Sequence, residues 1–508
     1  MTTSEGSRAT SYSIEYHEKT KYTPEGLARS ARQLDWSAQP HPYKEYRTGA
    51  VLDLRPYLPG QPEAEQNASS VQPDAGVAER CRISYVLYLT YGITAMVPHP
   101  GQPFYLRAAP SAGGLYPAEV YLISRGSAGF PPGLYNYQVQ SHSLVRFWSG
   151  DAWSDLEQAC FNHVAFTDST LAIAVSVVFW RSAWRYEDRA YRRVFLDSGH
   201  LLGNHELASA NGYHVHLVTG FLDDLVNDRL FLPKEEEAVI ALAVLGQEGT
   251  TANTCCALPS NVVTDYRPVP EGQRLNFLHE ISKLNQWRPL PAVAEPQEDK
   301  YNFPFCLKVP MQTEPLDWQG TLEHTIIRRR STRRYSGEDL TLAELKHLLD
   351  FTYQPGHYRD QGFDGAPEYA HLHLLETFVV VLGVEGLEAG CYYYAPRSNE
   401  LRQVRFKNFR SEVHRLCLGQ DLGRDSGAVV FHTADLPVAV RLYGERAYRT
   451  LHLDSGHLGQ RLNLAAIRLG LGVSGVAGFF DDQVNEVLGI PDQEAVLYIT
   501  TLGRPGGD

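Results

Sequence analysis

The sequence contains one domain twice, and this duplication constrains the fold more than any other feature of the chain. Gly-Leu-Tyr-Asn-Tyr at 133–137 returns as Gly-Cys-Tyr-Tyr-Tyr at 390–394, which is 257 residues later. Four further blocks return in the same order: 189–192 at 446–449, 196–200 at 453–457, 220–224 at 478–482 and 245–246 at 502–503. A period this long indicates a duplicated domain, because solenoid repeats are only about 20–50 residues long.

Each copy lacks a motif that the other copy keeps. Pro-Ser-Ala-Gly-Gly-Leu-Tyr-Pro at 110–117 corresponds to a segment beginning Pro-Glu-Tyr-Ala-His at 367–371. In the other direction, Arg-Arg-Ser-Thr-Arg-Arg-Tyr at 329–335 corresponds to a segment near 72–76. A second register, which aligns 351–353 with 89–91, moves that counterpart to 67–71. Neither counterpart contains an arginine, so the two motifs are complementary rather than duplicated.

The two motifs have the chemistry of two halves of one site. Arg329, Ser331 and Arg333 offer two guanidiniums and a hydroxyl, which suit a phosphate because arginine binds phosphate oxygens in a bidentate manner. The small residues of 110–117 leave backbone N–H groups open to a flat polar ring at close range. Five arginines, at 328, 329, 330, 333 and 334, lie within seven residues of a chain whose net charge is −13. We therefore expect one anionic ligand between the copies.

Composition excludes several classes of function. The net charge of −13 argues against sequence-independent binding of nucleic acid, which needs clustered cations. No run of 18 apolar residues and no apolar signal core occurs, so we expect neither a membrane span nor secretion. Seven cysteines without regular spacing favour a reducing compartment, and we expect the protein to be cytoplasmic. We interpret the pair Cys255-Cys256 as incidental thiols.

Two pairs of histidines have the spacing of a metal site on a strand. They are His214 with His216 and His371 with His373. Because no further cysteine or carboxylate has matching spacing, we predict no metal.

The pattern along the chain predicts four regions: an N-terminal arm over 1–74, the first copy over 75–250, a Pro-rich linker with one helix over 251–318, and the second copy over 319–508. Apolar β-branched runs predict strands, among them 120–124, 171–179, 377–384, 434–442 and 496–502. Helical periodicity is found at 197–211 and 454–469. Because helices and strands do not alternate strictly, we expect an α+β fold.

These motifs together resemble the nitroreductase-like flavoprotein superfamily. The match is strongest to SagB-type dehydrogenases, the oxidases of thiazole- and oxazole-modified peptide biosynthesis. The segments that carry the resemblance are 107–117, 133–135, 189–192, 197–200, 329–335 and 502–505. The resemblance implies a tandem nitroreductase-like fold in which one chain forms a pseudo-dimer.

The resemblance also implies an FMN site, because the superfamily binds FMN at a dimer interface. The residues implied to hold the phosphate and the ribityl chain are Arg329, Ser331, Arg333 and Arg504. Those implied to line the flavin ring are Pro110, Ser111, Ala112 and Gly113, and the backbone of Gly478 is implied to lie near its reactive face. The mirror-related site lacks both motifs and has Gln247 at the position of Arg504. We therefore expect one FMN per chain.

The expected catalytic group is Tyr186. The SagB-type pattern has Lys-Tyr before its Arg-x-Tyr-Arg block, whereas this chain has Arg185-Tyr186 in the first copy and Leu442-Tyr443 in the second. An arginine stays protonated and is a poor base. Tyr186, tuned by Arg185, would then act as acid or base, with Tyr443 as a weaker candidate. His200, His457 and the Asp-Asp pairs at 223–224 and 481–482 recur in both copies, which favours structural roles.

The expected function is desaturation of a heterocycle, such as an azoline, in a peptide or a related natural product, with dioxygen reoxidising the flavin. The substrate would be a peptide or a small molecule, and biosynthetic partner proteins are expected. The chain could act as a monomer or as a homodimer. Two alternatives stay open: an NAD(P)H-dependent nitro- or quinone reductase, and a flavin- or peptide-binding scaffold subunit without turnover.

Overall fold

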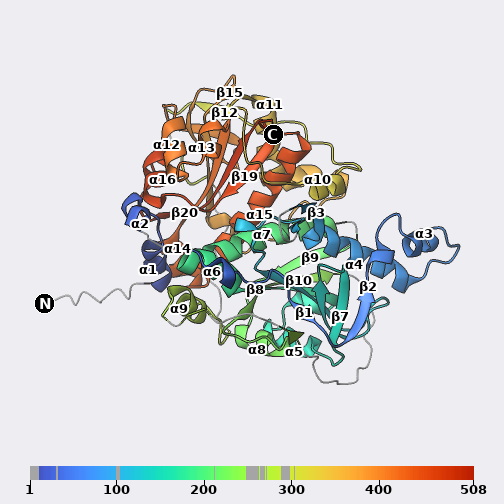
Figure 1. Ribbon diagram of the computed structural model, residues 1–508. Coiled ribbons are helices and arrows are strands. Elements are labelled where there is room, and N and C mark those ends of the chain that lie inside the picture. Colours follow the sequence, from blue (N-terminus) through green and yellow to red (C-terminus); the bar gives the residue numbers. More distant parts are fainter. Residues whose placement is uncertain are drawn as a thin grey trace.

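The two copies fold into two domains, each built on a seven-stranded antiparallel sheet with the same strand order (Figure 1). The computed structural model describes residues 11–29, 33–98, 103–210, 212–246, 262–263, 269–270, 272–287, 298–302 and 304–507. The first sheet has the order β2 (Ala50–Asp53), β7 (Ser143–Trp148), β6 (Gly133–Gln138), β5 (Ala118–Ser124), β8 (Ser169–Val178), β10 (Glu237–Gly246), β9 (His214–Val218). The second has the order β12 (Lys308–Pro310), β17 (Glu400–Arg405), β16 (Gly390–Ala395), β14 (Leu375–Val381), β18 (Ala428–Asp435), β20 (Glu494–Gly503), β19 (Gly472–Val476).

Three two-stranded ladders complete the sheet structure of the described residues: β1 (Glu45–Tyr46) with β11 (Val262–Val263), β3 (Ile93–Val97) with β4 (Phe104–Arg107), and β13 (Leu340–Thr341) with β15 (Val384–Glu385). The helices up to the linker are α1 (Tyr12–Lys19), α2 (Pro24–Arg29), α3 (Pro62–Ala68), α4 (Ala75–Tyr91), α5 (Trp153–Ala159), α6 (Phe179–Tyr186), α7 (Ala190–Ser209), α8 (Asp223–Arg229) and α9 (Arg274–Ile281). The helices of the second copy are α10 (Leu322–Arg328), α11 (Leu342–Tyr353), α12 (Arg410–Leu416), α13 (Asp421–Asp425), α14 (Leu436–Tyr443), α15 (Ala447–Arg468) and α16 (Asp481–Leu488).

The repeat found in the sequence is also a repeat of structure. The helices α6 and α14 have the same length and lie 257 residues apart, as do the strands β5 and β14. The helices α1 and α9 form a further pair at an offset of 262, which is the second register considered above. The tandem α+β architecture expected from the sequence is therefore confirmed.

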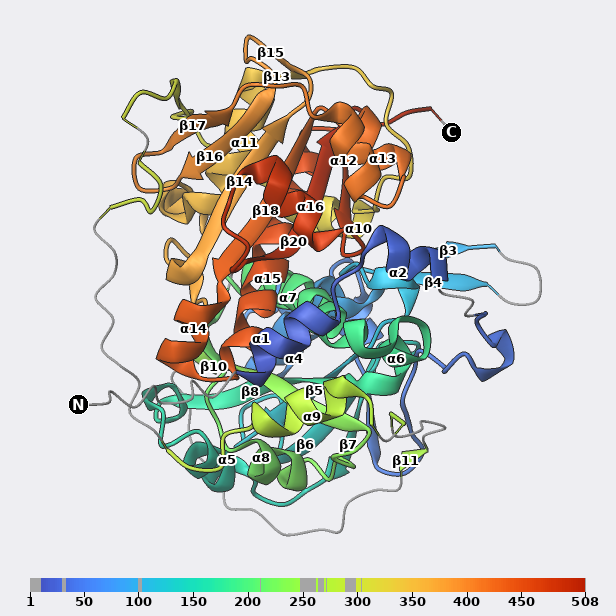
Figure 2. The same ribbon diagram turned by 90° about the vertical axis from the view of Figure 1, so that its left-hand side faces the viewer.

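The interface between the domains is centred on α7 and α15 (Figures 1 and 2). Gly199 of α7 faces the backbone of α15, where an added Cβ would collide with the carbonyl oxygen of Leu453. Gly456 of α15 faces α7 in the same way, and its Cβ would collide with the carbonyl oxygen of Leu196. The repeated Ser-Gly-His motif thus places glycine where two helix backbones touch, which only a residue without a side chain permits.

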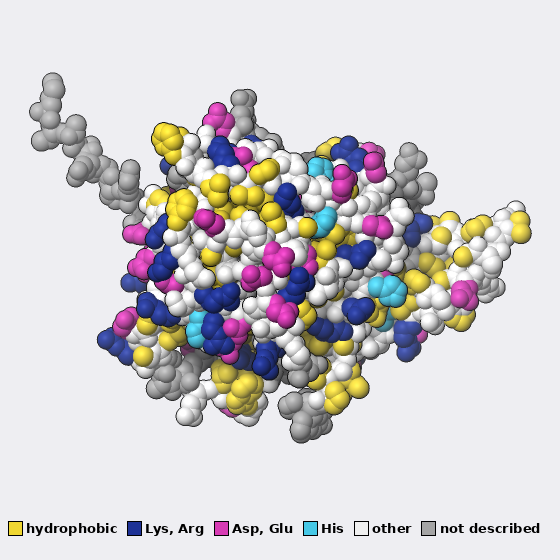
Figure 3. Space-filling view, turned by 90° about the horizontal axis from the view of Figure 1, so that it is seen from above, with side chains coloured by type: hydrophobic (Ala, Val, Ile, Leu, Met, Phe, Trp, Pro, Cys, Tyr) yellow, Lys and Arg dark blue, Asp and Glu magenta, His cyan; other side chains and the backbone are white. Residues whose placement is uncertain are grey.

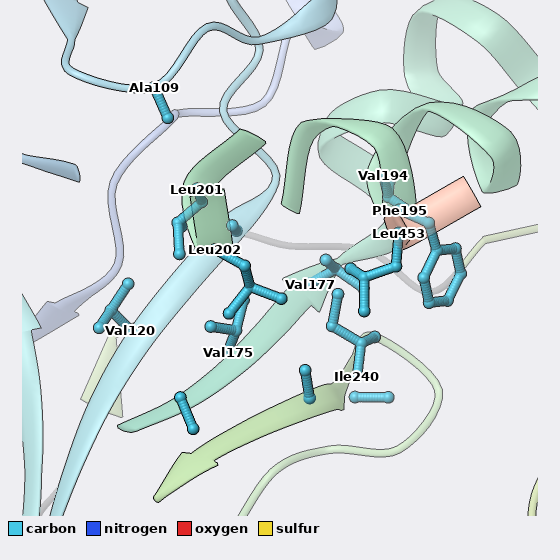
Figure 4. Close-up of a cluster of buried hydrophobic side chains, with 14 of the residues drawn as sticks. Ala109, Val120, Val175, Val177, Val194, Phe195, Leu201, Leu202, Ile240 and Leu453 are labelled. Carbon is cyan, nitrogen blue, oxygen red and sulfur yellow. The ribbon is translucent and has the colours of Figure 1, made fainter. Parts of the chain in front are cut away.

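The hydrophobic core of the first domain lies between α7 and its sheet (Figure 4). Val194, Phe195, Leu201 and Leu202 of α7 point toward residues of β5, β8 and β10. Leu453 of α15 reaches the same cluster from the second domain. Because one core contains side chains of both copies, the two domains bury apolar surface against each other and are not independent units.

Segments outside the expected repeats join the two domains together. Helix α1 from the N-terminal arm lies beside α14 of the second domain (Figure 2), and Ser13 N donates to Glu445 Oε2 over 2.7 Å. The linker helix α9 has the mirror-related place, where Arg449 Nη2 donates to the carbonyl oxygen of His279 over 2.6 Å. The arm also supplies β2, and the linker supplies β12, to the edges of the two sheets. The sequence pattern missed both strands, since they are short and lie at exposed edges.

The prediction of a strand over 434–442 is wrong. The strand β18 ends at Asp435 and the helix α14 begins at Leu436. Asp435 acts as the N-cap by accepting a hydrogen bond from Val438 N over 3.0 Å, and Pro437 occupies the first turn, where its missing N–H is harmless. These start signals outweigh the β-branched composition of the segment.

The outer surface is of mixed charge. Lysine, arginine, aspartate and glutamate side chains are interspersed over the face shown in Figure 3. Among the described residues, no helix is long and apolar enough to cross a membrane. Cys255, Cys256 and Gln247 lie outside the described residues.

Candidate functional site

The arginine motif and the Ser-Gly motif meet at the domain interface, as their chemistry predicts. Arg329 directly follows α10 of the second domain and reaches into the first domain. Its Nε donates to the carbonyl oxygen of Ala108 over 2.7 Å, and its Nη2 donates to that of Arg107 over 3.3 Å. These carbonyls belong to the segment that leads into Pro110. The contact therefore brings together residues that lie more than two hundred positions apart.

The guanidinium of Arg329 is buried but incompletely satisfied. The residue is 3% exposed, and its Nη1 has no hydrogen-bond partner among the described residues. Burial lowers the pKa of Arg329 to about 10, and the neighbouring Arg330 and Arg333 act in the same direction. A buried cation without a counter-charge is costly, so this position favours an anion.

The rest of the arginine motif runs along the last strands of the second domain. Thr332 N donates to the carbonyl oxygen of Val473 over 2.8 Å, and Ser336 N donates to that of Arg504 over 3.0 Å. Ser331 is half-buried in this segment, and Arg333 is exposed. The structure thus places the backbone of Arg504 beside the arginine motif.

Arg504 already has a protein partner. Its Nη1 and Nη2 donate to the two carboxylate oxygens of Glu344 over 2.7 and 2.9 Å. This bidentate pair fixes the planar guanidinium at the start of α11. Arg504 would have to exchange Glu344 for a phosphate in order to bind one.

The Ser-Gly loop is anchored to α7 of its own domain. Ser111 Oγ donates to Asp197 Oδ2 over 2.6 Å, and Ala112 N donates to Asp197 Oδ1 over 3.1 Å. Ser111 Oγ also accepts from Tyr116 N over 2.9 Å. Burial raises the pKa of Asp197 to about 7, although the bonds from Ser111 and Ala112 oppose this shift. The hydroxyl of Ser111 therefore supports the loop from within.

The face of the loop that remains open is formed by small residues. Pro110 and Ala112 are half-buried, and Gly113 is exposed. Gly113 has φ +66°, a left-handed conformation that residues with a side chain seldom adopt. A Cβ at Gly113 would lie 2.6 Å from Tyr186 Oη, so the phenol lies directly against this glycine.

Tyr186 and Arg193 extend this part of the site toward the second domain. The guanidinium of Arg193 lies 3.7 Å from the centre of the Tyr186 ring, which is the geometry of a cation–π contact. A Cβ at Gly478, in the second domain, would lie 3.6 Å from Arg193 Nη2. The guanidinium of Arg185 lies 5.6 Å from the Tyr186 ring. Tyr186, Arg185, Gly113 and Gly478 are therefore gathered in one place.

Sequence reasoning missed two supporting residues, Arg193 and Asp197. They are four positions apart on α7, so they lie on the same face of the helix. The recurrence of Asp197 as Asp454 is a signal that could have identified the anchor of the loop.

His200 is also an interface residue, in agreement with the structural role expected for it. Its Nε2 lies 2.8 Å from Tyr498 Oη and its Nδ1 lies 2.8 Å from Gln460 Oε1, both in the second domain. Burial lowers the pKa of His200 to about 3, so the imidazole is neutral at physiological pH.

The mirror-related half has the same backbone anchor but different side chains. Ala370 N and His371 N donate to Asp454, the counterpart of Asp197, over 3.0 and 2.6 Å. Glu368 accepts from Leu217 N over 2.8 Å. The Tyr369 ring lies 4.5 Å from the ring of His457. A carboxylate and a phenol ring thus occupy the half in which the first copy has small residues.

Tyr443 belongs to this second half. Its ring stacks on His371 at 3.8 Å between centres, and its hydroxyl lies 3.1 Å from His373 Nε2. The structure places Tyr186, but not Tyr443, beside the Ser-Gly loop of the first domain.

Within the part of the chain that the structure describes, one group of side chains could hold a metal. The ligand atoms of His214, His216 and Glu368 all lie within 4.8 Å of one another. His216 Nδ1 lies 2.9 Å from Glu368 Oε1, so this histidine already has a hydrogen-bond partner. His371 and His373 contact Tyr443 instead.

Comparison with known proteins agrees with the duplicated fold. The model of the nitroreductase family matches residues 90–247 and again residues 326–504. A crystal structure described as that of a candidate nitroreductase from Anabaena variabilis ATCC 29413 is 54% identical, with a TM-score of 0.87; the match covers 98% of this chain and 100% of that one. A protein of Methanocaldococcus jannaschii, also described as a candidate nitroreductase, is 33% identical over 183 residues, which are 36% of this chain and 90% of the relative. The chain is therefore a member of the nitroreductase family, whose members are oxidoreductases, and it carries the family domain twice.

Proposed function

We propose that the chain is an FMN-dependent oxidoreductase that holds one flavin between its two domains. The observation that carries this proposal is the contact of Arg329 with the carbonyls that lead into the Ser-Gly loop. The unpartnered Nη1 of Arg329 fits a phosphate oxygen, and the open face at Pro110–Gly113 fits a flat ring. Membership of a family that typically binds flavin supports the same ligand.

The residues would divide the binding of FMN between the copies. Arg329, Ser331 and Arg333 from the second domain would hold the phosphate and the ribityl chain, with Arg504 joining them if it leaves Glu344. Pro110, Ser111, Ala112 and Gly113 from the first domain would line the ring, and Gly478 would approach it from the second. When bound, FMN supplies a two-electron acceptor.

We further propose that the oxidised substrate is an azoline or a related heterocycle, as the SagB-type motifs suggest. Tyr186, in its phenolate form, would take the substrate proton at Oη and become the neutral phenol, because it lies against the ring-binding loop and Arg193 places a positive charge over its ring. Arg185 stays protonated and would assist only through its charge. Dioxygen would be the electron acceptor, and biosynthetic partner proteins would deliver a peptide substrate.

Flavin quantification on the purified protein tests the site. We expect about one FMN per chain, because only one of the two mirror-related sites between the domains has both motifs. The double variant Arg329→Ala, Arg333→Ala should lose the flavin. Arg424→Ala serves as the control, since Arg424 is an exposed arginine that pairs with Asp425. Full flavin occupancy in the double variant, or two flavins per chain, would contradict the proposal.

A second candidate function is an NAD(P)H-dependent nitro- or quinone reductase. Two observations favour it: the family match, and the arginine at position 185, where the SagB-type pattern has a lysine. Anaerobic mixing with NADPH separates the two: rapid bleaching of the flavin absorbance supports the reductase, whereas an unchanged spectrum supports a dehydrogenase that is reduced only by its substrate.

A further inference from the structure

The second domain contains a cavity of about 760 Å³ beside the 367–373 loop. Its wall is partly aromatic and aliphatic, and its charged side chains are three carboxylates, Glu298, Glu376 and Asp435, and two cations, Lys300 and Arg397. The lining residues that matter here are Glu298, Lys300, Tyr353, His373, Glu376 and Val438. They do not belong to the proposed FMN site, which lies at the Ser-Gly loop of the first domain.

In the first domain, the corresponding position is filled by a buried arginine. The guanidinium of Arg181 is fully buried and donates in three directions. Its Nη2 donates to Glu119 Oε1 over 2.6 Å, its Nη1 to the carbonyl oxygen of Tyr116 over 3.0 Å, and its Nε to that of His41 over 3.2 Å.

The repeat shows what replaces this arginine in the second domain. At the offset of 257, the three partners of Arg181 correspond to Glu376, His373 and Glu298, and all three line the cavity. Arg181 itself corresponds to Val438, which also lines it. The second domain has therefore kept the three partner positions of the guanidinium and lost the side chain that filled the space.

A second guanidinium is missing from the same region. In the first domain, Arg107 lies between aromatic rings, with its guanidinium 5.1, 4.4 and 4.6 Å from the ring centres of Tyr43, Tyr91 and Tyr116. Its counterpart in the second domain is Asp364, which does not line the cavity and lies near His214 instead. The positions that correspond to the three rings line the cavity: Lys300 and His373 correspond to Tyr43 and Tyr116 at the offset of 257, and Tyr353 corresponds to Tyr91 in the second register, at 262.

Glu376 is left without an ion-pair partner. Its carboxylate accepts from Tyr393 Oη over 2.7 Å, but no ion pair with it occurs in the part of the chain that the structure describes. Lys300, which shares the cavity wall, pairs with Glu494. Burial raises the pKa of Glu376 to about 7, although Tyr393 and Lys300 oppose this shift. A cation beside Glu376 would restore the charge balance that Arg181 gives to Glu119.

We propose that this cavity binds an organic cation with a guanidinium or ammonium head and an apolar body. The head takes the place of the absent Arg181 side chain and pairs with Glu376. The body lies against Tyr353 and Val438. The ligand therefore reproduces, from outside the chain, the ion pair that the first domain builds from its own residues.

Isothermal titration calorimetry on the full-length protein tests the cavity. The probes are phenethylguanidine and phenethylamine, with phenethyl alcohol as the neutral analogue. We expect saturable binding of the two cations and weaker binding of the alcohol. Glu376→Gln should weaken binding of the cations about tenfold or more, since it removes the charge that pairs with the head. Glu385→Gln, an exposed glutamate on β15, is the control and should bind as the wild type does.

Val438→Arg provides the sharper test, because it reinstates the side chain that the first domain has. The new guanidinium should fill the cavity, abolish binding of phenethylguanidine and raise the thermal midpoint. If this variant does not fold, the affinity of Glu376→Gln for the cations alone decides whether the proposal holds. Equal affinity for the cations and for phenethyl alcohol, unchanged affinity in Glu376→Gln, or no saturable binding to the wild type would each overturn the proposal. FMN content should be the same in all of these proteins, which separates the outcome from that of the flavin site.

Discussion

Tyr186 and Tyr443 occupy the same position in two copies of one helix, yet their neighbours differ. Tyr186 lies against Gly113 and beneath Arg193, whereas Tyr443 stacks on His371. The difference arises in the loop that each one faces. The phenol of Tyr186 faces a loop of small residues, whereas the ring of Tyr443 stacks on a histidine of its loop. Equivalent residues therefore have different chemistry because their contacts come from a neighbouring element.

Replacing Tyr186 separates flavin binding from turnover. Tyr186→Phe keeps the ring that packs against Arg193 and removes only the hydroxyl. We expect unchanged FMN content but about 100-fold slower turnover, the usual contribution of a positioned acid or base. Oxygen uptake with a thiazoline-containing model peptide gives the rate, and flavin absorbance gives the content. Tyr443→Phe is the matched variant, and we expect its turnover to be close to that of the wild type. A loss of turnover in Tyr443→Phe alone would mean that Tyr443, and not Tyr186, is the acid or base.

For these residues, the sequence predicted which ones lie close together better than it predicted the hydrogen bonds and ion pairs that each one makes. Arg329 contacts the carbonyls that lead into the Ser-Gly loop, which brings the two complementary motifs near each other. The ion pair of Arg504 with Glu344 could not be read from the sequence, because it depends on how the end of the chain lies across the start of α11. The anchoring of Ser111 by Asp197 has the same origin, since a loop meets a helix 86 residues further along the chain.

At the level of elements, the crossing of α7 and α15 is the least adaptable feature. Gly199→Ala would press a methyl group against the carbonyl oxygen of Leu453, and neither helix can move without disturbing its own sheet. We expect the free energy of unfolding to fall by about 1–3 kcal/mol, the range for overpacking. Gly356→Ala is the control, because the nearest atom outside its adjacent residues, the carbonyl oxygen of Gly365, would lie 3.8 Å from the added Cβ. Urea denaturation compares the two, and equal stabilities would show that the crossing can relax.

Elements followed the sequence where periodicity and start signals agreed. The buried strands β5, β14 and β20 lie where apolar β-branched runs predict them. The helix α14 did not, because its cap and proline decide its start while its composition favours a strand. The edge strands β2 and β12 could not be predicted, since their pairing is with distant strands and their own pattern is weak.

For the whole molecule, two ion-pair clusters relate the domains by the same pseudo-symmetry. Asp481 of the second domain accepts from Arg189 and Arg192 of the first over 2.9 and 2.7 Å. Asp223 of the first domain accepts from Arg446 and Arg449 of the second over 2.6 and 2.7 Å. Burial alone would raise the pKa of each aspartate, but the paired guanidiniums hold it below the ordinary value. Both clusters therefore act as charged contacts across the interface.

The two clusters should contribute equally to stability and unequally to flavin binding. Asp481→Asn and Asp223→Asn each leave two buried guanidiniums without a counter-charge, so we expect each to cost about 3–5 kcal/mol of unfolding free energy. The Asp481 cluster lies beside the proposed flavin site: Asp481 is three residues after Gly478, and Arg192 precedes Arg193, which contacts Tyr186. The Asp223 cluster is on the side of Tyr443.

We therefore expect Asp481→Asn to weaken FMN binding about tenfold, a typical strength of coupling between sites, and Asp223→Asn to leave it near the wild-type value. Thermal unfolding of the flavin-free proteins measures the loss of stability. Quenching of flavin fluorescence on titration measures the loss of FMN affinity. Equal loss of FMN affinity in both variants would mean that flavin binding depends on the general integrity of the interface. A loss in Asp481→Asn alone would mean that the two clusters stabilise the interface equally, while only one of the two mirror-related sites has kept a binding function.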